Sequence, residues 1–112
     1  PFTMIHTPVP AKTDEIVFFF IVGGLIGPIA EEVFFRGVLY GFFRRWGVLI
    51  ALILSSALFV LVHLPGLPLT QLVGAVVFAL AYEKAGSLTA PITIHVLGNM
   101  AIFTLSLIFS QP

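Results

Sequence analysis

The stretch IVFFFIVGGLIGPIAEEVFFRGVLYGFF, residues 16–43, is almost entirely apolar and contains three charged side chains in 28 residues. Asp14 and Glu15 stand just before it, and acidic residues favour the N-terminus of a helix. A helix over residues 15–43 would be roughly 43 Å long at about 1.5 Å per residue. That length exceeds the ~30 Å hydrocarbon core of a bilayer. The stretch therefore predicts a membrane-spanning helix, with a kink or break at GGLIGP, residues 23–28.

The composition of the whole chain is that of a membrane protein. Of its 112 residues, 59% are hydrophobic, 9% are charged and 12 are phenylalanine. A soluble domain carries roughly 25% charged residues, so this chain has too few charges to cover a globular surface. Its mean hydropathy is +1.14. We therefore predict an all-α, polytopic transmembrane bundle of about four helices in a single domain.

Three further helices are predicted from the apolar runs and the residues that end them. The second covers residues 48–63 and ends at HLPGLP, residues 63–68, where two prolines and a glycine prevent its continuation. The third covers residues 69–84. The fourth begins at Ser87 as N-cap, with Pro91 in its first turn, and ends near residue 110. We assign residues 1–14 to a loop or tail and residues 15–110 to the membrane-embedded core.

Charge and cysteine content exclude several classes of partner and site. The net charge is zero, so nothing indicates a nucleic-acid partner. The chain contains no cysteine, which removes disulfides, thiolate metal sites and cysteine nucleophiles. It begins with Pro1, and no basic segment precedes the first apolar run, so we expect no signal peptide. We also expect the chain to be part of a longer protein.

The positions of the basic residues predict an orientation in the membrane. Arg44 and Arg45 lie between the first two helices, and Lys84 lies between the last two. The order of the helices puts these loops, residues 44–47 and 84–87, on the same side of the bundle. The positive-inside rule makes that side cytoplasmic. We expect an integral membrane protein, in the plasma membrane of a prokaryote.

The charged residues within the first helix are costly in a membrane, at roughly 2.5–3.5 kcal/mol each on insertion scales. Glu32 and Arg36 are four residues apart, so they lie on one helix face and can pair. Glu31 is rotated by about 100° from Glu32 around the helix. Its carboxylate is therefore free for another role, whereas Glu32 with Arg36 can be a structural ion pair.

Other polar residues are expected at the same membrane depth. Counted from the cytoplasmic loops, Glu31 lies roughly 20 Å deep, His63 roughly 24 Å, His95 roughly 12 Å and Asn99 roughly 18 Å. Polar groups from three helices therefore fall in one layer. Structural roles remain possible, with His63 as a helix cap and His95 with Asn99 as an interhelical hydrogen-bonded pair.

Three motifs in this layer resemble those of a known family. EEVFFRG, residues 31–37, is similar to an EExxxR motif, FVLVH, residues 59–63, to FxxxH, and HVLGN, residues 95–99, to HxxxN. Together they resemble the CPBP family, also called Abi, of CAAX prenyl proteases and bacteriocin-processing enzymes. The motifs occur in order and extend, with similar flanking residues, over about 85 residues.

The resemblance implies a fold, an activity and residue roles. Members are glutamate-dependent intramembrane endopeptidases that need no cofactor, and their substrates are membrane-associated or lipidated peptides. Glu31 would be the general base, His63 would position or activate the water, and His95 with Asn99 would stabilise the oxyanion. The supporting residues would be Glu32, Arg36 and Phe59.

Other mechanisms and functions stay open at this point. With no cysteine and no G-x-S-x-G motif, water is the expected nucleophile. Glu31, His63 and His95 could instead bind a catalytic zinc ion, because two histidines and a glutamate are a known ligand set. The chain could also be a non-catalytic bacteriocin self-immunity protein or membrane scaffold. A proton or ion conductor is a further alternative, although the polar groups form one layer rather than a continuous path.

Overall fold

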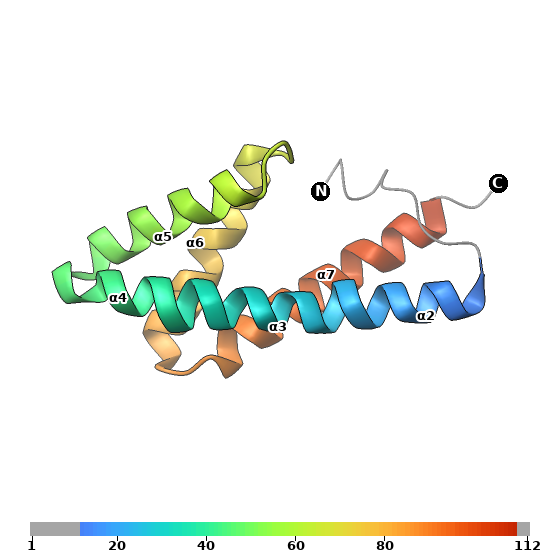
Figure 1. Ribbon diagram of the computed structural model, residues 1–112, viewed down its shortest axis with the longest axis horizontal. Coiled ribbons are helices and arrows are strands. Elements are labelled where there is room, and N and C mark those ends of the chain that lie inside the picture. Colours follow the sequence, from blue (N-terminus) through green and yellow to red (C-terminus); the bar gives the residue numbers. More distant parts are fainter. Residues whose placement is uncertain (1–11, 110–112) are drawn as a thin grey trace.

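A computed structural model describes residues 12–109 of the chain, and over that range it contains four helices and no strand. The first helix, Thr13–Trp46, runs without interruption along the longest dimension of the molecule (Figure 1). Its successive segments are α2 (Thr13–Ile21), η1 (Val22–Ile26), α3 (Gly27–Glu32), η2 (Val33–Tyr40), α4 (Gly41–Phe43) and η3 (Arg44–Trp46). The other helices are α5 (Val48–Val62), α6 (Pro68–Ala85) and α7 (Thr89–Phe109). The predicted all-α bundle is therefore confirmed.

The sequence predicted a kink or break at residues 23–28, and the break is absent, because the first helix continues through them (Figure 1). Segment η1 is π-helical: the N–H of Gly27 donates to the carbonyl of Val22, five residues back. In an α-helix, the ring of Pro28 would clash with the carbonyl four residues before it. The wider π-helical turn just before the proline relieves this crowding, so the helix does not end.

The predicted boundaries of the second and third helices agree with the structure to within one residue. The first helix extends beyond its predicted end at residue 43, through η3 to Trp46, and the start of α7 also differs from the prediction. That helix begins at Thr89, and the N–H of Ile92 donates to the carbonyl of Leu88 at 3.0 Å. Ser87 lies before this turn and does not cap the helix, contrary to the prediction. Thr13 and Asp14 belong to α2 rather than to a tail. The rest of the predicted tail, residues 1–11, and the predicted helix end at residue 110 lie outside the described residues.

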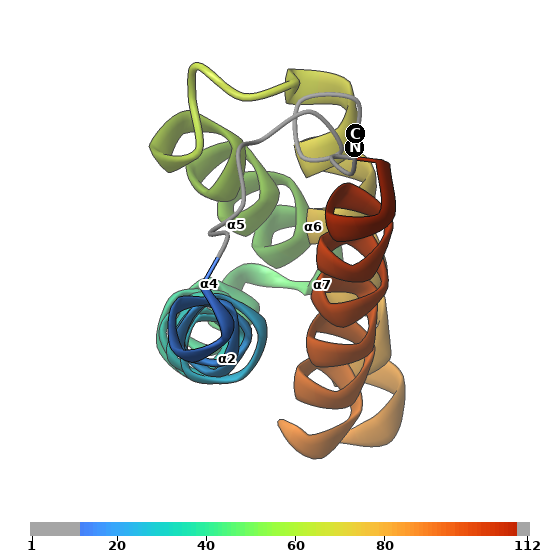
Figure 2. The same cartoon turned by 90° about the vertical axis from the view of Figure 1, so that its right-hand side faces the viewer.

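Each half of the first helix has its own packing partner. Helix α5 packs on the second half, formed by η2 and α4, and α7 packs on the first half, formed by η1 and α3, while α6 lies between α5 and α7. Figure 2 shows the first helix end-on with α7 beside it. Gly23 and Gly24 permit this approach, since added Cβ atoms would lie 2.9 Å from Phe103 and 2.8 Å from Met100.

Two loops meet at one end of the bundle, as predicted from the helix order. Arg44 Nε donates to Glu83 Oε1 at 2.9 Å, and the hydroxyl of Tyr40 donates to the same oxygen at 2.7 Å. These bonds join the α4–α5 connection to the end of α6. Gly47 and Gly86 end their helices with φ of 109° and 68°, a backbone region that favours glycine.

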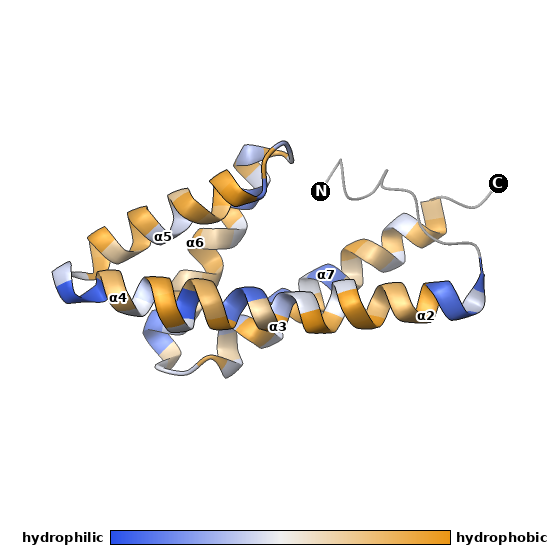
Figure 3. Cartoon of the chain, in the orientation of Figure 1, coloured by the Kyte–Doolittle hydropathy of each residue, from blue (hydrophilic) through white to orange (hydrophobic). Residues whose placement is uncertain are grey.

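The bundle encloses polar side chains beside two apolar clusters and exposes many apolar residues on its outside. Its fully buried side chains include Glu32 and Arg36, whereas Phe18, Leu69 and Leu97 are each more than half exposed. Figure 3 shows hydrophobic residues along much of the helices, with hydrophilic residues at both ends and near the middle of the first. Two helices, Thr13–Trp46 and Thr89–Phe109, are long and apolar enough to cross a bilayer. This distribution fits a protein surrounded by lipid.

Candidate active site

Glu31 lies at the centre of the polar layer, between two histidines from other helices. Its Oε2 is 3.2 Å from Nε2 of His63, which follows α5 directly. Its Oε1 is 3.4 Å from Nε2 of His95 on α7. The Glu31 side chain remains 37% exposed. The structure therefore brings together three of the residues selected from the sequence, and leaves the carboxylate accessible to a ligand.

The tautomer of His63 follows from its second contact. Its Nδ1 lies 2.6 Å from the carbonyl oxygen of Phe59. A carbonyl only accepts hydrogen bonds, so Nδ1 carries the hydrogen and a neutral His63 has none on Nε2. The short contact between Nε2 and the Glu31 carboxylate consequently requires a proton on one of the two groups. The expected role of His63 as a helix cap is confirmed, since it is the C-cap of α5 and its Nδ1 bonds to a carbonyl of the last turn, while its Nε2 contacts Glu31.

His95 joins the two adjacent glutamates. Its Nδ1 lies 2.6 Å from Glu32 Oε2, while its Nε2 faces Glu31. Glu32 also contacts Arg36, with Oε1 and Nε 3.3 Å apart, and both side chains are fully buried. The ring of His95 therefore lies between the two carboxylates, with one nitrogen facing each of them.

The Glu32–Arg36 pair anticipated from the sequence is present, and it does more than neutralise charge. Arg36 Nη2 donates to the carbonyl of Ala75 on α6 at 2.6 Å. The guanidinium carbon also lies over two aromatic rings, 5.0 Å from the centre of Phe59 and 5.4 Å from that of Phe78. Arg36 thereby fixes the first helix to α5 and α6 at the level of the histidines.

The same two rings support the histidines. Phe59 stacks on His63 with centroids 4.1 Å apart and an interplanar angle of 23°. Phe78 stacks on His95 at 4.4 Å and 15°. Phe59 was selected from the sequence because it lies four residues before His63. Phe78 was not, because α6 carries no recognisable motif and its partner comes from another helix.

Asn99 lies near this cluster and bonds to the backbone of the first helix. In η1 the carbonyl of Val22 accepts from the N–H five residues later. The next carbonyl, that of Gly23, would need the N–H of residue 28, which proline lacks. Asn99 Nδ2 donates to this carbonyl at 3.2 Å. One amide hydrogen of Asn99 thus replaces the backbone N–H that Pro28 lacks. The other amide hydrogen of Asn99 remains for a ligand.

A pocket of about 270 Å³ opens onto the cluster. Four residues selected from the sequence line it together with Phe59: Glu31, His63, His95 and Asn99. Its remaining wall consists of residues that the sequence analysis missed, namely Thr70, Gln71, Gly74, Phe78, Gly98 and Ile102. The sequence contains one signal for them, the spacing of Gln71, Gly74 and Phe78 along one face of α6.

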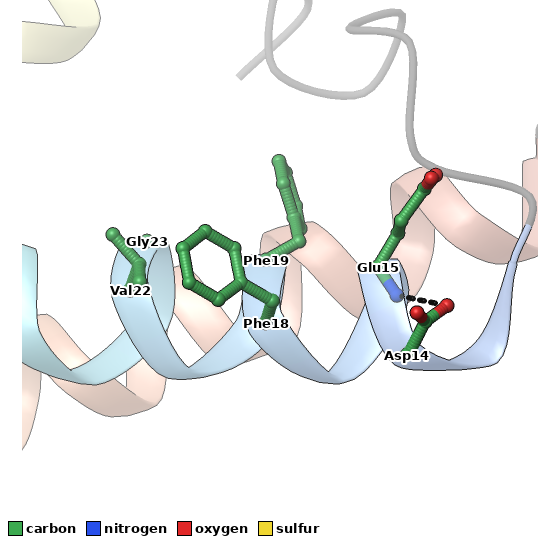
Figure 4. A pocket seen from close by; sticks show the side chains of 6 residues that line it. All are labelled: Asp14, Glu15, Phe18, Phe19, Val22 and Gly23. Atoms are coloured by element: carbon green, nitrogen blue, oxygen red, sulfur yellow. Dashed lines mark hydrogen bonds between the residues drawn. The ribbon is translucent and has the colours of Figure 1, made fainter.

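A larger pocket, of about 680 Å³, lies along α2 and η1 (Figure 4). It is lined by Asp14, Glu15, Phe18, Phe19, Val22 and Gly23. Its polar groups are at the helix start, where the N–H of Glu15 donates to Asp14 Oδ1 at 3.0 Å. This larger pocket is lined by no histidine and by no residue of the Glu31 cluster. The volume of a pocket therefore does not identify the reactive site in this protein.

Metal binding was an alternative for Glu31, His63 and His95. Within residues 12–109, no group of three or more His, Asp or Glu side chains is arranged to hold a metal ion. The imidazole nitrogens lie 2.6–3.4 Å from oxygens of the two glutamates and of a backbone carbonyl.

Comparison with known proteins identifies a family. Residues 13–101 match the family model described as type II CAAX prenyl endopeptidase Rce1-like. No curated protein and no solved structure matched the chain. The matched range includes the EExxxR, FxxxH and HxxxN motifs and nearly all of the described bundle. With its two apolar helices, the chain is therefore an integral membrane protein and belongs to the type II CAAX prenyl endopeptidase Rce1-like family.

Proposed function

We propose that this protein is an intramembrane endopeptidase that hydrolyses a peptide bond of a membrane-associated, prenylated substrate without a metal ion. One observation carries the proposal: the partly exposed Glu31 carboxylate lies between Nε2 of His63 and Nε2 of His95 at the wall of a pocket. The membership of the Rce1-like family supports the substrate class.

Glu31 acts as the general base in the proposed reaction. It takes a proton from a water molecule as the water oxygen attacks the carbonyl carbon of the scissile peptide bond. His63 Nε2, adjacent to Glu31 Oε2, positions the same water and shares its proton. When the C–N bond breaks, that proton passes to the leaving amine. The products are a new carboxyl terminus and a released amine, so all atoms of the water are accounted for.

His95 and Asn99 stabilise the tetrahedral oxyanion. The imidazolium form of His95 donates from Nε2, and Asn99 donates the amide hydrogen that Gly23 does not use. Removing one such donor from an oxyanion hole typically reduces kcat by roughly 10²–10³. Glu32 keeps His95 in the required tautomer and supplies the opposing charge. Its role resembles that of the aspartate in a serine-protease triad.

The basic residues of the loops indicate how the bundle is oriented in the membrane. The α4–α5 and α6–α7 loops share one end of the bundle, and this end contains Arg44, Arg45 and Lys84. We propose that this end faces the cytoplasm, in accordance with the positive-inside rule.

A peptide panel tests the proposed function. Purified protein in detergent is incubated with farnesylated and plain CAAX peptides, and Glu31→Ala and His95→Ala are compared with the wild type. Leu97→Ala is the matched control, because Leu97 is two residues from His95 but 64% exposed on the outer face of α7. We expect cleavage by the wild type and the control only. Equal cleavage by all four proteins would refute the site assignment.

A further inference from the structure

The wall of the pocket opposite Glu31 consists of α6 and α7 and contains two glycines. Gly74 on α6 and Gly98 on α7 both line the pocket. An added Cβ at Gly98 would meet no atom within 4 Å, so this backbone borders open space. At Gly74 an added Cβ would lie 3.6 Å from the ring of Phe78, so the backbone of α7 at Gly98 is the more open of the two.

Helix α6 contributes two polar side chains to this wall, Thr70 and Gln71. Both are half-buried, and neither side chain forms a hydrogen bond or ion pair within residues 12–109. Gln71 is the one that carries an amide, and its amide nitrogen lies near the turn that precedes α6, 3.7 Å from the Cβ position of Gly66. The Gln71 amide is therefore free to bond to a ligand in the pocket.

The chemistry of a glutamine amide matches that of a peptide group. It offers two N–H donors and one carbonyl acceptor, whereas the backbone of an extended peptide presents an acceptor and a donor. A substrate must be extended at the bond that is cut, and at membrane depth its unpaired backbone groups cost several kcal/mol each. An endopeptidase of this kind must replace those lost bonds. The Glu31 cluster supplies donors to the scissile carbonyl only, so another residue must bond to a neighbouring peptide group.

We propose that Gln71 is a positioning residue that bonds to a backbone amide of the substrate next to the scissile bond, while the substrate chain lies over Gly74 and Gly98. This inference rests on the proposed peptidase function. It concerns the binding of the backbone and is independent of the side chains of the substrate. A pocket of about 270 Å³ is slightly smaller than sites that enclose drug-sized ligands, so it accepts only a short part of the substrate.

Single-cysteine labelling tests whether a peptide occupies this wall. The chain has no cysteine, so Gln71→Cys gives one thiol without background. Val73→Cys is the control, because Val73 is on the same helix but 56% exposed on its outer face. Both variants carry Glu31→Gln to prevent turnover and are treated with N-ethylmaleimide, with and without a farnesylated CAAX peptide. We expect the peptide to slow labelling at residue 71 at least about fivefold and to leave residue 73 unchanged.

Absence of protection at residue 71, or equal protection at both residues, would overturn the proposal. Labelling does not depend on hydrolysis. Protection with no cleavage by the wild type would refute the proposed function and retain this binding role. Cleavage without protection would retain the proposed function and refute this binding role.

Kinetics with modified peptides test the hydrogen bond itself. Gln71→Met keeps the length of the side chain and removes its amide. Since one hydrogen bond contributes up to about 1.5 kcal/mol, we expect KM to rise about tenfold with little change in kcat. Peptides N-methylated at each position in turn should show one position where methylation impairs the wild type but not Gln71→Met. An unchanged KM together with no such position would overturn the proposal, since a purely structural role would not produce this coupling.

Discussion

Glu32 has two partners in the structure, and their separate contributions can be measured. It pairs with Arg36 and accepts a bond from His95 at 2.6 Å. Glu32→Leu leaves the fully buried guanidinium of Arg36 without its counter-ion. Removing one partner of a buried ion pair costs about 3–5 kcal/mol. Arg36 would keep its hydrogen bond to the Ala75 carbonyl and its contacts with two aromatic rings. We therefore expect the free energy of unfolding to fall by about 3 kcal/mol, the lower end of this range.

The double variant Glu32→Leu with Arg36→Met separates stability from activity. Replacing both members of a buried pair by apolar residues of similar size is often close to neutral. The carbonyl of Ala75 lies within α6, where it has a helical partner, so losing Arg36 adds little cost. The unpaired Nδ1 of His95, about 1–3 kcal/mol, is a cost that both variants share. We therefore expect the double variant to regain most of the loss of about 3 kcal/mol that the unpaired Arg36 causes in Glu32→Leu.

Activity should not recover with stability. Both variants lack the carboxylate that holds His95, and the equivalent change in a serine-protease triad lowers kcat by about 10⁴. We expect cleavage of a farnesylated CAAX peptide to fall at least about 100-fold in both. Stability is measured by denaturant unfolding in detergent, and kcat by single-turnover cleavage. If the double variant recovers activity as well as stability, Glu32 is only a counter-ion for Arg36 and the assignment is refuted.

Three further predictions concern other parts of the site. Dialysis against a strong chelator should leave peptide cleavage unchanged, and a loss of activity that zinc restores would show that Glu31, His63 and His95 bind a metal. Asn99→Ala should lower kcat by roughly 10²–10³, with KM little changed, and an unaltered kcat would exclude Asn99 as an oxyanion donor. Gly98→Ala should raise the free energy of unfolding by up to about 1 kcal/mol, because alanine favours a helix interior and meets no atom there. Gly98→Leu should block cleavage by filling the pocket, and full activity of this variant would show that the substrate lies elsewhere.

The helices and the polar layer could be predicted from the sequence because each leaves a local pattern. Apolar runs and the glycines and prolines between them mark the helices, and the four-residue spacing of Glu32 and Arg36 predicts their pair. The break at residues 23–28 was predicted wrongly because the usual effect of Pro28 was assumed. A π-helical turn, together with a bond from Asn99, accommodates that proline, and both depend on packing against α7.

Contacts between helices account for most of what the sequence did not reveal. Glu32 was assigned to Arg36 alone, because spacing on one helix shows nothing of a partner 63 residues away. Phe78 and Gln71 were overlooked for the same reason. Their helix contains no motif, and their positions beside His95 and in the pocket appear only when α6 and α7 are placed together.

The central claim, that Glu31 activates water rather than attacking the substrate itself, can be tested with isotopically labelled water. The wild type cleaves a farnesylated CAAX peptide in H₂¹⁸O for many turnovers, and mass spectrometry then determines the label in the product and in the enzyme peptide that contains Glu31. If Glu31 is a general base, one ¹⁸O enters each new carboxyl terminus and the Glu31 side chain stays unlabelled. Label in the Glu31 carboxylate, which a covalent acyl intermediate would leave there, would contradict the account.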